Sequence, residues 1–136
     1  MQIVYYQTKS GRLPTREYLS KYDPTKPNDY KKLAKVDSVI RLAAERGGRP
    51  GGDFSSSLQN YDFQELKIPE GERLVRIPYF IFRKEKLVLL NAFDKPKLYE
   101  SGKKRKVDLN IHLFYEEANR FYKDFLKNPN QHEKYD

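Results

Sequence analysis

Hydrophobic and polar side chains alternate at the start of the chain and again in three segments near its middle. A period of two, rich in β-branched and aromatic residues, is typical of strands. The strands predicted in this way span residues 2–7, 61–68, 72–83 and 86–93. Because only Pro69-Glu70-Gly71 and Lys84-Glu85 connect the last three, we expect these to form an antiparallel meander.

Three other segments repeat their apolar residues at spacings of three and four, which predicts helices with one buried face. The first spans residues 14–21 and opens with Pro14, as a first helical turn tolerates. The second runs from Asn28 or Asp29 to about Arg46. The third covers residues 107–127 and has the most regular apolar rhythm in the chain.

The order of strand, two helices, three strands and a helix predicts one α+β domain over residues 1–127. Segments 47–60 and 95–106 are expected to be loops, and 128–136 a polar tail that frays. We expect two layers, with the helices, the C-terminal one included, clustered against one face of a mostly antiparallel sheet. The other face then stays free for a partner.

Composition excludes several classes of protein. The 136 residues are 38% hydrophobic, and 11 Tyr and 8 Phe suffice to form a core. The absence of Cys excludes disulfides, thiolate nucleophiles and thiolate metal sites. No apolar segment approaches the roughly 18–20 residues of a spanning helix, and the first residues lack the pattern of a secretory signal. We therefore expect a cytoplasmic protein.

The positive charge is concentrated in one part of the chain. There are 27 Lys and Arg against 19 Asp and Glu, a net charge of +8. Residues 67–106 alone carry 12 basic and 5 acidic side chains, and hence +7. A localised basic surface suggests a polyanionic partner such as nucleic acid, although a solvated surface that aids solubility has the same composition.

Strand parity separates a core face from a face toward the partner. An unpaired charge is costly in a core, so Arg76 is expected on the open face, and Glu65 and Lys67 with it. Aromatic Phe63 and Phe80 would join this basic surface and suit RNA bases. The alternative is a cross-strand salt bridge between Glu65 and Arg76.

Pro78 conflicts with a regular central strand because proline cannot donate to the hydrogen-bond ladder. Either the strand bulges there or it lies at an edge of the sheet. A bulge would shift the parity and bring Tyr79 to the open face.

Four segments together resemble the RelE/ParE toxin superfamily, in particular its phage-derived HigB-like branch. They are IVYYQTKSGRLPTREYL, FQELKI, LVRIPYFIF and VLLNAFDKPK, and the resemblance covers about residues 3–125. It implies a RelE-like fold and a small bacterial or phage toxin neutralised by an antitoxin, which we expect to be of helix-turn-helix type. Many such toxins are ribosome-dependent endoribonucleases that cut mRNA without a metal or other cofactor.

The resemblance places the functional cations at Lys67, Arg76, Lys95 and Lys97. Metal-free cleavage needs a base for the 2′-OH, cations for the charge on phosphate, and an acid for the leaving 5′-oxygen. Lys95 is the candidate base, with Glu65 as the alternative. Arg76 would stabilise the phosphate.

Further RNA contacts are expected around these candidate catalytic residues. Arg73 would assist Arg76 if a bulge turns it inward, and Lys97 would position the RNA backbone. A basic run is expected to help dock on ribosomal RNA. It consists of Lys103, Lys104, Arg105 and Lys106.

Two other functions remain open: a ParE-like inhibitor of DNA gyrase, and a non-catalytic RNA-binding module. The antitoxin could dock on the C-terminal helix or mask the basic face. His112 is expected at the surface and His132 in the tail, and their separation argues against a zinc site.

Overall fold

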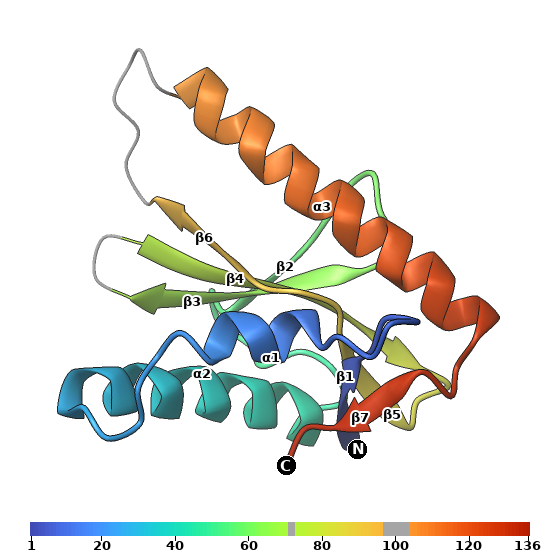
Figure 1. Cartoon of the computed structure of the whole chain (residues 1–136), viewed down its shortest axis with the longest axis horizontal. Helices are drawn as coiled ribbons and strands as arrows, with labels where there is room; N and C mark the ends of the chain where they lie inside the picture. The colour runs from blue at the N-terminus through green and yellow to red at the C-terminus, as the bar shows by residue number, and fades with distance from the viewer. Residues whose placement is uncertain (71–72, 97–103) are drawn as a thin grey trace.

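The structure, a computed structural model, describes residues 1–70, 73–96 and 104–136, and within these ranges the side chains other than those of 70, 73, 96 and 104–110. Over these residues, seven strands form one sheet on which three helices pack (Figure 1). The strands are β1 (Gln2–Tyr6), β2 (Ser55–Ser57), β3 (Gln64–Glu70), β4 (Arg73–Phe82), β5 (Lys86–Leu89), β6 (Phe93–Pro96) and β7 (His132–Lys134). The helices are α1 (Pro14–Leu19), α2 (Pro27–Glu45) and α3 (Lys104–Lys127).

The sheet is mixed and mostly antiparallel. Its order is β2-β3-β4-β5-β1-β7, and β6 also pairs with β4. β3, β4 and β5 form the expected antiparallel meander, whereas β1 lies parallel to β5, which requires the crossover that α1 and α2 supply. The predicted α+β class, with a first strand, two helices, a meander and a C-terminal helix, is confirmed.

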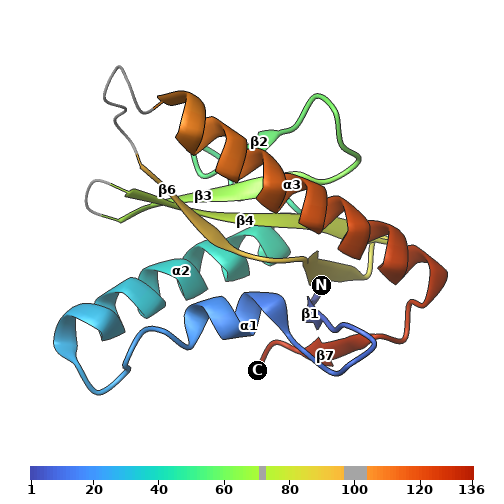
Figure 2. The ribbon, with the colours of Figure 1, turned by 45° about the horizontal axis from the view of Figure 1, so that its top comes forward.

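The helices are divided between the two faces of the sheet. α1 and α2 cover one face, and α3 crosses the other (Figures 1 and 2). Tyr5 joins Ile40 of α2 in one buried cluster, whereas its neighbour Val4 joins Phe125 of α3 in a second. The expectation that all helices cluster against one face is therefore corrected. Because β1 and β5 are apolar on both sides, both faces must be covered.

β4 contacts three strands, because β5 and β6 share one of its edges. Tyr79 lies opposite Leu89 of β5, and Arg76 lies opposite Phe93 of β6. The two residues of β4 between these positions therefore face three residues, 90–92, in the neighbouring segment. One extra residue in one of two paired strands is a β-bulge.

Pro78 is accommodated in a central strand by this bulge. Its carbonyl accepts the N–H of Leu90 at 2.9 Å. In an antiparallel ladder the nitrogen and oxygen of one residue point the same way, so the missing N–H faces the interruption between β5 and β6. The bulge is thus opposite β4 rather than in it, and Tyr79 stays in the core, 0% exposed, instead of turning to the partner face.

Several boundaries differ from prediction. Segment 47–60 is not all loop, because it contains β2, which pairs with β3. The single strand predicted over 86–93 is divided by the bulge into β5 and β6. Segment 95–106 is not all loop either: β6 extends to Pro96 and α3 begins at Lys104.

The C-terminal tail packs against the sheet instead of fraying. β7 pairs antiparallel with β1. The ring of Tyr135 lies 5.3 Å from that of Tyr5, and its hydroxyl donates to Asp37 Oδ1 at 2.7 Å. The Asp136 carboxylate lies 3.1 Å from Arg41 Nη2. An aromatic ring beside the core offsets the entropy of ordering these residues.

Tyr135→Ala is expected to lower the free energy of unfolding by roughly 2–3 kcal/mol, because it removes a packed ring and the hydrogen bond to Asp37. Urea denaturation followed by circular dichroism measures the loss. The matched control is Tyr30→Ala, since Tyr30 is 61% exposed on α2, and it is expected to change stability by less than about 0.5 kcal/mol. Equal stability of the two variants would contradict a packed tail.

Candidate nucleic-acid interface

The three cations predicted to be catalytic lie on the same face of the sheet. Lys67 of β3 is opposite Arg76 of β4, and Arg76 is opposite Phe93 of β6. Lys95 is two residues beyond Phe93 and therefore projects to the same face. Lys67 and Lys95 are both half-buried. We call Lys67, Arg76 and Lys95 the cationic row.

The bulge determines that Lys95 joins this face. Leu89 packs in the cluster under α2, so uninterrupted alternation along 86–96 would turn Lys95 toward α2 as well. The extra residue at 90–92 reverses the parity beyond it. Asp94 points the other way as a result: its carboxylate accepts a hydrogen bond from Tyr18 and lies 2.9 Å from Lys21 Nζ.

Arg76 is held in a buried ion pair. Its Nη1 donates to Glu65 Oε1, and the side chains of Arg76 and Glu65 are 11% and 2% exposed. Tyr115 of α3 donates to Glu65 Oε2 at 2.5 Å, and Ser56 of β2 donates to Oε1 at 3.3 Å. The cross-strand salt bridge, which strand parity left as the alternative, is therefore present.

This network limits what each group can do chemically. The Glu65 carboxylate is buried and both of its oxygens already accept hydrogen bonds, which leaves it little access to an RNA 2′-OH and makes it a poor candidate for a general base. Arg76 is a fixed cation whose field is partly compensated by Glu65. Its Nε is buried without a hydrogen-bond partner, so the site holds one donor that is not satisfied within the described residues.

α3 covers the part of this face that was expected to offer aromatic rings to RNA. Phe63 and Phe80 are 2% and 7% exposed. The ring of Phe80 packs edge-on against Tyr122 and Phe125 of α3, at centroid distances of 4.8 and 5.5 Å. The prediction that Phe80 and Phe63 face the partner is wrong, because the apolar stripe of α3 needs these rings as its core.

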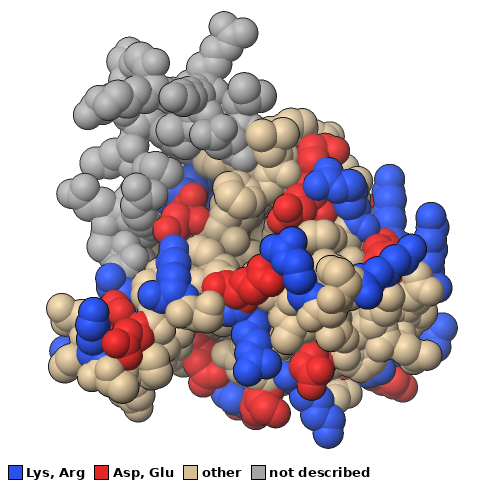
Figure 3. Space-filling model, in the orientation of Figure 1, with Lys and Arg blue, Asp and Glu red and all other residues tan. Residues whose placement is uncertain are grey.

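The other predicted RNA contacts fall partly outside the described residues. Lys97 and Lys103 are not described. The side chains of four others are not described either, although their backbones lie in β4 or in the first turn of α3: Arg73, Lys104, Arg105 and Lys106. On the face seen in Figure 3, the Lys and Arg side chains outside the grey region alternate with Asp and Glu.

The two histidines have local roles. His112 is exposed, as predicted, with its Nε2 3.7 Å from Glu116 Oε1. His132 packs near Phe125, and its Nδ1 lies 2.9 Å from the Pro129 carbonyl. Across residues 1–70, 73–96 and 104–136, no group of three or more potential His, Cys, Asp or Glu ligands could hold a metal ion. In the same part of the chain, no helix combines the length and apolar character needed to cross a membrane.

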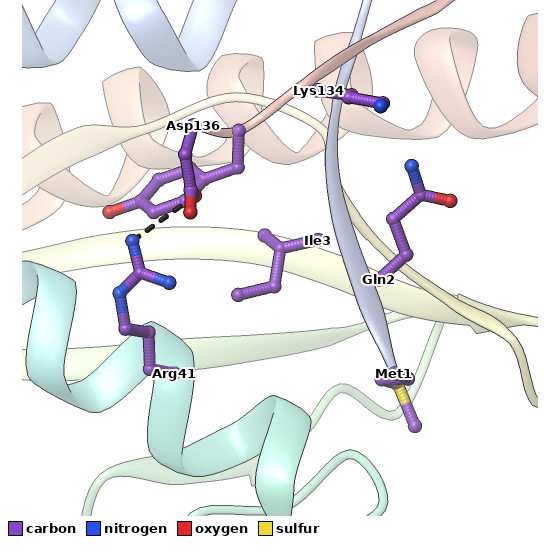
Figure 4. Close-up of a pocket in the computed structure, with 7 residues that line it drawn as sticks. Met1, Gln2, Ile3, Arg41, Lys134 and Asp136 are labelled. Atoms are coloured by element: carbon purple, nitrogen blue, oxygen red, sulfur yellow. Dashed lines mark ion pairs between the residues drawn. The ribbon is translucent and has the colours of Figure 1, made fainter.

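Among the hollows formed by the described residues, two bear on candidate sites of this protein. One, of about 320 Å³, is built from the ends of the chain and α2, where Arg41 pairs with Asp136 (Figure 4). The other is a groove of about 360 Å³ between α3 and the segment that joins β2 to β3. Tyr115 lines this groove and also binds Glu65, so the groove adjoins the cationic row.

Sequence reasoning missed Tyr115 and Ser56. The sequence pattern places Tyr115 in the apolar stripe of the C-terminal helix and Ser56 in a loop. A signal for Tyr115 exists, because a tyrosine in a helix stripe usually finds a partner for its hydroxyl. Nothing in the sequence identifies that partner as Glu65, which is 50 residues away.

Comparisons with known proteins do not identify a family. A scan against protein-family models gives no match, and a search of the curated proteins gives none.

Glu65→Leu is expected to lower the free energy of unfolding by about 3–5 kcal/mol, because it leaves Arg76 buried without a counter-charge. The double variant Glu65→Leu/Arg76→Leu is expected to be more stable than the single variant, since no charge is stranded. Urea denaturation of both variants measures the difference. Glu17→Leu is the matched control: it breaks the exposed Arg12–Glu17 pair, and should cost less than about 1 kcal/mol.

Proposed function

We propose that this protein is a cytoplasmic toxin of RelE/ParE type that cuts mRNA on the ribosome and is neutralised by an antitoxin. The observation that carries the proposal is the strand register, by which Lys67, Arg76 and Lys95 share one face of the sheet. These residues stand in the segments that resemble the family's motifs. A cluster of fixed cations is what stabilisation of a phosphate transition state requires.

The proposed reaction is attack by an RNA 2′-oxygen on the adjacent phosphorus. A base removes the 2′-OH proton, the new O–P bond forms, and the bond to the 5′-oxygen breaks as that oxygen takes up a proton. The products are a 2′,3′-cyclic phosphate and a 5′-hydroxyl. We assign the base to Lys95 in its unprotonated amine form, the stabilising charge to Arg76, and the proton for the leaving oxygen to Lys67 in its protonated form.

Glu65 acts in this scheme as a positioning residue. Its ion pair holds the guanidinium of Arg76 in one orientation, and Tyr115 and Ser56 hold Glu65 in turn. A preorganised cation needs no reorientation as charge builds on the phosphate. The cost is that Glu65 reduces the net charge at the site.

A non-catalytic RNA-binding module is the second candidate, and the Glu65–Arg76 pair favours it. With 11% of its side chain exposed, Arg76 presents little surface to a phosphate. The half-buried Lys67 and Lys95 would then bind RNA without cutting it, and binding would weaken steeply with added salt.

Mapping of mRNA 5′ ends after induced expression tests the proposal. The wild-type chain is expected to generate new 5′ ends in translated mRNA, and Lys67→Ala and Lys95→Ala to reduce them at least about tenfold. Lys35→Ala is the matched control, because Lys35 is an exposed lysine of α2 on the opposite face, and it should cut like the wild type.

Two results would decide against the nuclease, and a third would decide against the roles assigned to the lysines. Salt-sensitive RNA binding by the purified chain without new 5′ ends would support the binding module. Inhibition of DNA gyrase without RNA cleavage would support the ParE-like alternative. Undiminished cleavage by both lysine variants would remove their assigned roles.

A further inference from the structure

The groove between α3 and the segment preceding β3 has the composition of a binding site rather than of a packing defect. It has a volume of about 360 Å³, within the range of small-molecule sites. Its lining combines aromatic rings with side chains that both donate and accept hydrogen bonds. The residues that line it are Ser57, Leu58, Gln59, Asn60, Tyr61, Ile111, His112 and Tyr115.

Two tyrosine rings form a rigid wall of the groove. The ring of Tyr61 stacks on Phe63 at 5.0 Å and lies 6.0 Å from Tyr115, tilted by 32°. The Tyr61 hydroxyl donates to Glu116 Oε1 at 2.6 Å, and the Tyr115 hydroxyl donates to Glu65. Both rings are therefore fixed before any ligand arrives, which lowers the entropic cost of stacking on them.

The polar groups of the groove can read the edge of a flat heterocycle. Gln59 and Asn60 are exposed, and each carries an amide with two donors and one acceptor oxygen. His112 lies on the opposite side of the groove, on α3. Amides beside aromatic rings are the combination with which proteins bind unpaired RNA bases.

A phosphate is disfavoured in the same groove. The Glu116 carboxylate accepts the Tyr61 hydroxyl at the groove wall. Burial, together with this carboxylate, raises the pKa of Tyr61 to about 12, so the Tyr61 hydroxyl stays protonated and donates to Glu116, whose negative charge remains at the wall. A neutral aromatic ligand avoids the repulsion that an anion would meet there.

The cationic row beside the groove supplies the positive charge for the phosphate of such a nucleotide. Tyr115 lines the groove and binds Glu65, and Glu65 pairs with Arg76 of the cationic row. Ser57 lines the groove while the preceding Ser56 contacts Glu65. The groove and the cationic row therefore adjoin each other through Tyr115 and Glu65.

We propose that this groove binds one unpaired nucleobase of an RNA strand whose backbone lies along Lys67, Arg76 and Lys95. The inference rests on the proposed function for its ligand class, RNA, but not for cleavage. It makes Tyr61 the stacking platform and Asn60 and Gln59 the groups that select the base.

Binding of fluorescent RNA oligonucleotides to the purified full chain tests this inference. The probes are a single-stranded hexanucleotide and the same strand made abasic, measured by anisotropy. The wild type is expected to bind the strand with bases more tightly. Tyr61→Ala should weaken that binding about tenfold, as loss of one stacking contact does, and leave the abasic strand unaffected.

The controls separate stacking from folding. Tyr61→Phe keeps the ring and should retain most of the affinity. Tyr30→Ala removes an exposed tyrosine of α2 and should change neither probe. If Tyr61→Ala unfolds, Asn60→Ala at an exposed position replaces it, and is expected to change the order of preference among the four bases.

The outcomes distinguish the groove from the nuclease. If the chain cuts no mRNA but binds RNA in a base-dependent way that Tyr61→Ala abolishes, the base site is supported and the nuclease is rejected. The proposed base site would be contradicted if Tyr61→Ala lowered the affinity for both probes equally or for neither. It would also be contradicted if the wild type bound the strand with bases no more tightly than the abasic strand. Capture of an antitoxin peptide in place of RNA would overturn it as well.

Discussion

The arrangement of the candidate site depends on one extra residue opposite Pro78. Because three residues, 90–92, face two of β4, the alternation of side chains reverses between β5 and β6. Lys95 thereby joins Arg76 and Lys67, and Asp94 turns toward α1. Without this bulge the cations would be divided between the two faces of the sheet, and Pro78 would interrupt a continuous ladder.

The bulge also links the sheet to α3. Asn91 is buried within it, and its amide donates to the Phe114 carbonyl at 3.2 Å and to Glu117 Oε1 at 3.1 Å. Beyond the bulge, Phe93 stacks on Phe114 at 4.7 Å. The bulge that determines on which face Lys95 lies thus also positions α3. The cationic row and the helix that packs on the same face therefore form one unit.

Arg76 is a buried charge in this unit and therefore requires a counter-charge. A charge beside an apolar helix needs a partner, and Glu65 supplies it, with Tyr115 reaching from α3 to complete the carboxylate's hydrogen bonds. The same tyrosine forms part of the wall of the groove. The ion pair, the helix and the groove are therefore coupled through Tyr115. A substitution of Tyr115 would alter the hydrogen bond to Glu65, the packing of α3 and the wall of the groove.

The sequence alone determined the elements and their order, because the periods of two and of three to four residues are local properties. It also placed Lys67 and Arg76 on one face, since only two residues separate β3 from β4 in the chain and the two strands pair in regular register. The family resemblance pointed to the same cations. These inferences needed no knowledge of which segments meet in space.

Only the tertiary structure decided what covers each face, what Arg76 contacts, and where the tail goes. α3 is amphipathic whichever side of the sheet it packs on, so its pattern could not reveal that Phe80 lies beneath it. The partners of Tyr115 and Tyr135 are 50 and 98 residues away in the chain. Such contacts follow from how helices cover a two-sided sheet, which leaves no local signature, and from one bulge. Pro78 indicated an irregularity at this place, but not that the extra residue lies in the neighbouring segment.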